Sequence, residues 1–159
     1  MKKFFLVTII TANLFLLCAA MSTGNDVSST REEIIRKQIL EVQEEMKAAA
    51  ENFHPDELFK YVLDVNDVII ENGELRTTRK DALNITRQGF EGIKELIYTY
   101  NHKNIRVISP STVLWTATGT TTFALEDGRE ITRDFAETLV FVLQDGQWKV
   151  LHAHRSSPN

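Results

Sequence analysis

Side chains suited to proton transfer lie close to the C-terminal end of the chain. Asp145-Gly146 is a dipeptide typical of a two-residue hairpin turn, and the strand expected after it carries His154 and Arg155. Counting outward from this turn along two antiparallel strands places His154 beside Glu137. A carboxylate, an imidazole and a tyrosine hydroxyl can each carry a proton, so the candidate catalytic residues are Glu137, His154 and Tyr100. Charged networks are more often structural than catalytic, so a role of the Glu137–His154 pair in the sheet or in a dimer interface is favoured over catalysis.

A second group of residues is expected on the opposite face of the same sheet. Counting from a two-residue turn at Asp127-Gly128 places Thr118 beside Glu137 and assigns Trp115 to the other face, where small side chains surround Arg155. Such small residues leave volume that a ligand can fill, and aromatic residues of neighbouring strands would line the same space. Close packing of backbone against a helix is the alternative explanation for them. The candidate ligand-binding residues are Arg155, Trp115, Asp134, Thr138 and Tyr98.

The composition excludes several kinds of site. The chain has a formal net charge of -4, which argues against a nucleic-acid partner because phosphate binding needs a basic surface. Cys18 is the only cysteine, so disulfides and thiolate catalysis in the folded domain are excluded. His152 and His154 share a face of the last strand, but no clear third ligand accompanies them, so no metal site and no cofactor are predicted.

The beginning of the chain has the layout of a secretory signal peptide. Two lysines after Met1 are followed by an uncharged, mostly apolar run that ends in small residues at Ala19 and Ala20. We therefore expect residues 1–20 to be removed and the protein to be exported, either to the periplasm or out of the cell. A membrane anchor is the alternative, and a lipid on Cys18 would also hold the protein at a membrane. Residues 21–29 are small and polar and are expected to form a flexible leader.

Residues 30–159 are expected to form one domain, with helices first and strands second. The pattern predicts a long helix that begins with a capping box at Thr30, then a short helix, a hairpin at Asn72-Gly73 and a third helix capped by Thr78. From Leu96 onward, long β-branched and aromatic runs separated by turn dipeptides predict four consecutive antiparallel strands. This order predicts an α+β fold in which the helices cover one face of a curved sheet.

The order of elements resembles the nuclear transport factor 2-like superfamily, which includes SnoaL-like proteins and ketosteroid isomerases. The last strand is similar to that of the association domain of calmodulin-dependent kinase II in the residues Asp145, Gly146, Trp148, Val150, His152, His154, Arg155 and Ser156. The resemblance implies a cone-like fold, with a curved mixed or antiparallel sheet and three N-terminal helices packed on its concave face. It also implies self-association.

The resemblance bears on two positions of the candidate site. In the kinase association domain the matching arginine lines a pocket, so Arg155 is expected to line one here, although the other arginines of that pocket fall near Gly119 and Leu139, where this chain has none. In ketosteroid isomerases an aspartate removes the substrate proton, and the matching position is Asn72, whose amide cannot act as a base. Isomerase chemistry is therefore not expected through that position.

These patterns predict an exported, homodimeric domain that binds an unidentified small molecule in its cone and has no established catalysis. An enzyme is the first alternative, either an isomerase or a hydratase that acts on a small apolar carbonyl compound. An oligomerisation module is the second alternative, in which one face of the last strand, from Trp148 to His154, is buried between subunits. The sequence leaves open whether the protein is an enzyme.

Overall fold

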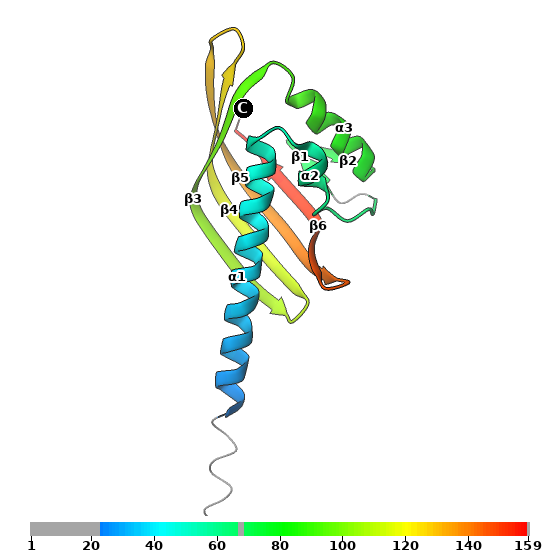
Figure 1. Ribbon diagram of the computed structural model, residues 1–159, viewed down its shortest axis with the longest axis vertical. Coiled ribbons are helices and arrows are strands. Elements are labelled where there is room, and N and C mark those ends of the chain that lie inside the picture. The colour runs from blue at the N-terminus through cyan, green and yellow to red at the C-terminus, as the bar shows by residue number, and fades with distance from the viewer. Residues whose placement is uncertain (1–22, 67–68, 159) are drawn as a thin grey trace, which may run out of the picture.

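A computed structural model describes residues 23–66 and 69–158 of the chain (Figure 1). The predicted signal peptide, residues 1–20 with Cys18, lies outside the described residues. The helices are α1 (Thr23–Glu51), α2 (Pro55–Phe59) and α3 (Arg79–Gly89). The strands are β1 (Ile69–Glu71), β2 (Glu74–Arg76), β3 (Ile93–Ser109), β4 (Thr112–Leu125), β5 (Glu130–Gln144) and β6 (Gln147–Ser156). Within the described residues, no helix combines the length and the apolar character needed to span a bilayer.

One six-stranded sheet forms the body of the domain, in the order β2-β1-β6-β5-β4-β3. Strands β3 to β6 are consecutive and antiparallel, as the sequence predicts, and β1 joins β6 in parallel, which makes the sheet mixed. Asn72 and Gly73 have φ angles of 49° and 83°, which fit the predicted two-residue turn between β1 and β2. The prediction of an α+β fold with a curved mixed sheet and N-terminal helices is confirmed (Figure 1).

Helix α1 lies across one face of the sheet, which we call the concave face (Figure 1). Ile35, Ile39 and Met46 recur at helical spacing and are buried. They share one hydrophobic cluster with Trp115 and Phe141, whose side chains come from β4 and β5 and are fully buried. The concave face therefore carries the main core of the domain.

The start of α1 differs from the sequence prediction. The helix begins at Thr23, so residues 23–29, expected as a flexible leader, are helical in backbone conformation. Thr30 lies inside the helix rather than capping it. Serine and threonine are only modestly unfavourable inside a helix, so the polar residues before Thr30 do not stop it. Figure 1 shows these first turns extending beyond the sheet.

Helix α1 also covers the free edge of β3, the outermost strand. Glu51 accepts a hydrogen bond of 2.7 Å from the backbone N–H of Tyr98, and Glu44 forms an ion pair of 3.1 Å with Lys103. An uncovered strand edge can pair with another chain, so these contacts protect the edge as well as fixing the position of α1 along it.

The hairpin at Asp127-Gly128 has a longer turn than predicted. Only the glycine has a positive φ, 88°, so the turn contains three residues rather than two. The Asp127 carboxylate accepts hydrogen bonds from the backbone N–H and the guanidinium of Arg129, at 3.1 and 2.7 Å, and these bonds stabilise the longer turn. The extra residue shifts β4 against β5 by one position, so Ala117 pairs with Glu137, and the prediction that Thr118 lies beside Glu137 is wrong.

A bulge in β6 changes the second register. The Asp145-Gly146 turn has two residues, as predicted, with φ angles of 51° and 76°. Leu151 is then an extra residue, because the register of β6 against β5 shifts by one at this point. Beyond the bulge Arg155, rather than His154, pairs with Glu137, so the predicted Glu137–His154 pair is wrong.

Candidate functional site

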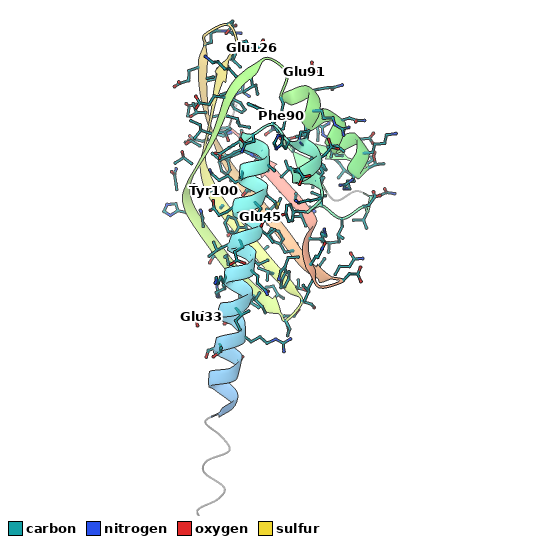
Figure 2. All side chains as sticks on the ribbon, in the orientation of Figure 1. Glu33, Glu45, Phe90, Glu91, Tyr100 and Glu126 are labelled. Atoms are coloured by element: carbon teal, nitrogen blue, oxygen red, sulfur yellow. The ribbon has the colours of Figure 1, made fainter. Side chains whose placement is uncertain are left out.

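The two register shifts bring a group of polar and aromatic side chains together on the concave face. We call this group the Arg155 cluster, and its members are Tyr98, Tyr100, Trp115, Thr121, Phe135, Glu137 and Arg155. The strands β3, β4, β5 and β6 each contribute to it. Figure 2 labels Tyr100 on β3, near the level of Glu45 on α1. Trp115 shares a hydrophobic cluster with Ile39 of α1, and Tyr100 packs against it, so the Arg155 cluster lies on the face of the sheet along which α1 runs.

Glu137 is held by two neutral donors. The indole N–H of Trp115 donates to Oε1 at 3.0 Å, and the hydroxyl of Tyr100 donates to the same oxygen at 3.2 Å. Oε2 accepts no hydrogen bond from any residue in the described part of the chain, and it is not fully buried. One oxygen of this carboxylate is therefore fixed, whereas the other remains accessible.

The Tyr100 hydroxyl is kept in its protonated form. Burial raises the pKa of Tyr100 well above its ordinary value, and the negative charge of Glu137 and the hydrogen bond to it raise the pKa further. The phenol is therefore a hydrogen-bond donor at any physiological pH. Its ring also packs edge-on against Trp115 and Phe135, at centroid distances of 5.9 and 5.6 Å.

Arg155 is held by uncharged groups. Its Nη1 donates to the Tyr98 hydroxyl at 3.0 Å, and its Nη2 donates to Oγ1 of Thr121 at 2.6 Å. The guanidinium also stacks over the rings of Phe135 and Tyr98, 4.3 and 4.8 Å from their centroids. Among the described residues no carboxylate forms an ion pair with Arg155, although it is only partly exposed. A cation of this kind can bind an anionic oxygen.

The structure brings together five of the predicted site residues and separates three. Tyr98, Tyr100, Trp115, Glu137 and Arg155 all belong to the Arg155 cluster. Asp134 and His154 are exposed, and Thr138 pairs with His154, so these three lie on the outer face of the sheet. The sequence predicts the wrong face for them because the three-residue turn between β4 and β5 and the bulge in β6 each shift the register by one residue. A shift of one residue moves a side chain to the other face of the sheet.

Thr121 and Phe135 belong to the cluster but were not predicted. Both lie on the concave face, because Thr121 pairs with Arg133 and Phe135 pairs with Gly119. The only signal for them in the sequence is the alternation of β4 for Thr121 and of β5 for Phe135, which becomes informative once the register of these strands is known. No group of three His, Cys, Asp or Glu side chains within residues 28–66 and 69–158 is placed to hold a metal ion.

Gly119 explains part of the run of small residues on β4. A Cβ built at this position would lie 2.2 Å from the backbone oxygen of Thr99 and 3.0 Å from the Phe135 ring. The glycine therefore permits a close approach of the β3 and β4 backbones beside a bulge in β3. Of the two explanations for the small residues, backbone packing holds at Gly119, although its partner is β3 rather than a helix.

Two open clefts lie beside α1, away from the Arg155 cluster. One, of about 370 Å³, is lined by residues of α1 and α2 and of the segments before and after α2. The other, of about 580 Å³, lies between α1 and the turn that joins β5 to β6. Neither is lined by a member of the cluster, so the cluster is a separate feature of the molecule.

The sequence profile of the SnoaL-like domain matches residues 39–159, which include the whole sheet and every residue of the cluster. The chain belongs to the SnoaL-like domain family. The predicted resemblance to SnoaL-like proteins is thereby confirmed, and the fold is that of nuclear transport factor 2-like proteins. No curated protein sequence matches this SnoaL-like domain.

Several solved structures share the fold of this SnoaL-like domain. A candidate calcium/calmodulin-dependent protein kinase II association domain from Xanthomonas campestris is 17% identical, with a TM-score of 0.68, over 76% of this chain and 85% of that chain. A candidate scytalone dehydratase from Novosphingobium aromaticivorans is 12% identical, with a TM-score of 0.75, over 82% and 89%. A candidate dehydratase of the NTF2-like family from Streptomyces avermitilis is 16% identical, with a TM-score of 0.71, over 80% and 99%. Identities this low show the fold alone.

Proposed function

We propose that this SnoaL-like domain binds a small organic molecule on the concave face of its sheet, and that Arg155 holds an anionic oxygen of that molecule. The observation that carries the proposal is the partly buried guanidinium, which has aromatic and hydroxyl partners but no carboxylate among the described residues. A buried charge is costly unless it is paired, so a counterion supplied by a ligand would gain more here than at the surface.

The remaining donors of Arg155 make a carboxylate a suitable partner. The guanidinium has five N–H groups in a rigid fork, and the contacts to Tyr98 and Thr121 use one each on two different nitrogens. The aromatic rings fix the plane of the fork, so little side-chain entropy remains to be lost on binding. The fork is thus oriented before a ligand arrives.

Calorimetric titration with short carboxylates tests this role of Arg155. The probes are linear monocarboxylates of three to six carbons and the oxo acids of the same lengths. Arg155→Gln is expected to weaken binding about tenfold or more, a loss of about 1.4 kcal/mol or more. Arg106→Gln is the matched control, because it removes the same charge from an exposed position of β3 that faces away from the cluster. Equal losses in both variants would indicate attraction to net charge and would reject the site.

A second function, in an enzyme, is favoured by the accessible Oε2 of Glu137. A carboxylate fixed through one oxygen can accept a proton through the other, and its neighbour Arg155 could stabilise negative charge on a carbonyl oxygen. Two proteins of similar fold are named as dehydratases, and dehydration or its reverse, hydration, requires such a proton acceptor. In this version the protein is an isomerase or hydratase acting on a small carbonyl compound.

Deuterium exchange in heavy water separates the enzyme from the binding domain. The protons beside the ketone of each oxo acid are followed by NMR, with and without the protein. If Glu137 is a base, the wild type accelerates exchange and Glu137→Gln lowers the rate about 100-fold. Glu130→Gln, an exposed position on the same strand, should leave the rate unchanged. A wild type that gives no acceleration has no such activity and leaves binding as the function.

The proposal includes export and a homodimer. Export is supported by the signal-peptide layout of residues 1–20, and a dimer by the outer face of the sheet, where Leu114, Val140 and Val142 are only partly buried. Trp148 is buried in the core and its indole donates to Gln38, so the partner would contact outward residues such as His152 rather than Trp148. Intact-mass measurement of protein purified from its own host tests export, since loss of residues 1–20 or a lipid on Cys18 changes the mass.

A further inference from the structure

We infer that the side-chain amide of Gln43 on α1 is a third contact of the Arg155 site, and that the ligand is a short oxo acid whose ketone oxygen accepts a hydrogen bond from Gln43. The inference rests on the proposed function, because it requires that the concave face binds a carboxylate through Arg155. It adds a residue from the helix and narrows the class of ligand.

Gln43 is unusual among the polar residues of α1. Only 5% of its surface is exposed, whereas most other polar residues of the described helix are exposed. Its Nε2 is buried and has no hydrogen-bond partner in the described part of the chain. The buried neighbours on the same side of the helix, Ile39 and Met46, are apolar. A buried amide without a partner is unfavourable, so a polar side chain at this position indicates an acceptor outside the protein.

The contacts between α1 and β3 place Gln43 at the level of the cluster. Glu44, the next residue, forms its ion pair with Lys103. Lys103 pairs with Ala117 across the sheet, Ala117 pairs with Glu137, and Glu137 pairs with Arg155. Glu44 contacts β3 at the edge of this row. Its neighbour Gln43 is on the buried side of the helix, and this side faces the row itself.

A small side chain and a bulge lie in the row below the helix. Ala117 lies between the edge strand and Glu137 and has the smallest side chain that a non-glycine residue can have. A bulge at Tyr100 shifts the register of β3 beside it. In the inferred complex, a small molecule lies across this row and meets Arg155 at one end and the Gln43 amide at another point along its length.

The chemistry of Arg155, Gln43 and Glu137 defines the class of ligand. Arg155 and Gln43 Nε2 are both donors, so each needs an acceptor, but only Arg155 is charged. A carboxylate satisfies Arg155, and a neutral ketone oxygen satisfies the amide without burying a second negative charge near Glu137. A linear oxo acid carries both groups, whereas an unsubstituted alkanoate carries only the first.

Calorimetry with matched pairs of ligands tests the inference. Each oxo acid of three to six carbons is compared with the alkanoate of the same length, in the wild type and in Gln43→Met. Methionine keeps the length and the helix preference of the side chain but removes its donor. We expect the wild type to prefer one or more oxo acids by about tenfold, and Gln43→Met to abolish that preference while binding alkanoates as the wild type does. Gln88→Met, on the exposed surface of α3, should keep the preference.

The outcomes separate this inference from the proposed function. If alkanoates bind through Arg155 but the wild type does not prefer oxo acids, or if Gln43→Met keeps the preference, the inference is wrong and the carboxylate site stands. If no probe binds the wild type, the carboxylate site and the inference are both rejected. Gln43→Leu provides a second apolar variant, and if neither variant folds, the amide is a structural contact and the inference is again wrong.

Discussion

Glu137 and Arg155 face each other on neighbouring strands, yet no ion pair joins them within the described structure. Neutral groups hold each charge instead, with Trp115 and Tyr100 on the carboxylate and Tyr98 and Thr121 on the guanidinium. A direct ion pair would neutralise both groups. Because their partners are neutral, Arg155 keeps a hydrogen-bond donor and Glu137 keeps an acceptor available to a ligand.

The raised pKa of Tyr100 predicts a loss of stability in alkaline solution. The folded state holds the phenol proton more tightly than the unfolded chain, whose tyrosines lose it near pH 10. This contribution is complete below pH 10 and is lost as the pH rises above that value. The melting temperature of the wild type should therefore fall more steeply between about pH 10 and 12 than that of Tyr100→Phe. Parallel slopes for the two proteins would contradict the buried, protonated phenol.

The close approach at Gly119 predicts a large effect of a single methyl group. The Cβ of Gly119→Ala would collide with a backbone oxygen that cannot move without distorting β3, so we expect a loss of about 3 kcal/mol in the free energy of unfolding. Gly89→Ala is the control, because a Cβ at this helical position meets no atom within 4 Å and should add about 0.5 kcal/mol. Chemical denaturation measures both. Equal effects of the two substitutions would show that β3 and β4 are not in close contact.

At the scale of elements, the sequence predicts which strands form but not how two of them align. Asp127-Gly128 and Asp145-Gly146 are the same dipeptide, yet one forms a three-residue turn and the other a two-residue turn. The difference arises from the hydrogen bonds between Asp127 and Arg129, which the dipeptide alone does not reveal. The bulge at Leu151 has no local signal at all. Residue types therefore predict most members of the Arg155 cluster. Which of these residues contact one another, and on which face of the sheet they lie, depends on the register of the strands.

The contact between α1 and the edge of β3 makes a prediction at the same scale. Glu51 accepts the Tyr98 backbone N–H and is mostly buried, so Glu51→Ala should cost about 1–2 kcal/mol of stability and speed hydrogen exchange at that amide. Glu41 is the control, because its only ion-pair partner among the described residues is Lys37 and its side chain is 61% exposed. Glu41→Ala should change neither quantity. Unchanged exchange at Tyr98 in Glu51→Ala would mean that the helix does not cover this edge.

For the whole molecule, the two faces of the sheet have different roles. The concave face carries α1, the core and the Arg155 cluster. Helix α2 packs against α1, and α3 packs against α2 and β2. The described helices therefore leave the outer face of β3 to β6 uncovered (Figure 1). Ile97 on that outer face is 43% exposed. A ligand and a second copy of the chain would therefore use opposite faces, so binding and association can be changed independently.

This separation predicts that a charge on the outer face abolishes the dimer without affecting the ligand site. Val140 pairs with Leu114 and His152 near the middle of the outer face, so Val140→Lys places a charge where the partner sheet would pack. Sedimentation velocity should show a dimer for the wild type and a monomer for this variant, with carboxylate binding unchanged. Ile34→Lys, on an exposed side of α1, should remain dimeric. A monomeric wild type would reject the dimer, and a Val140→Lys protein that stays dimeric would place the interface on another surface.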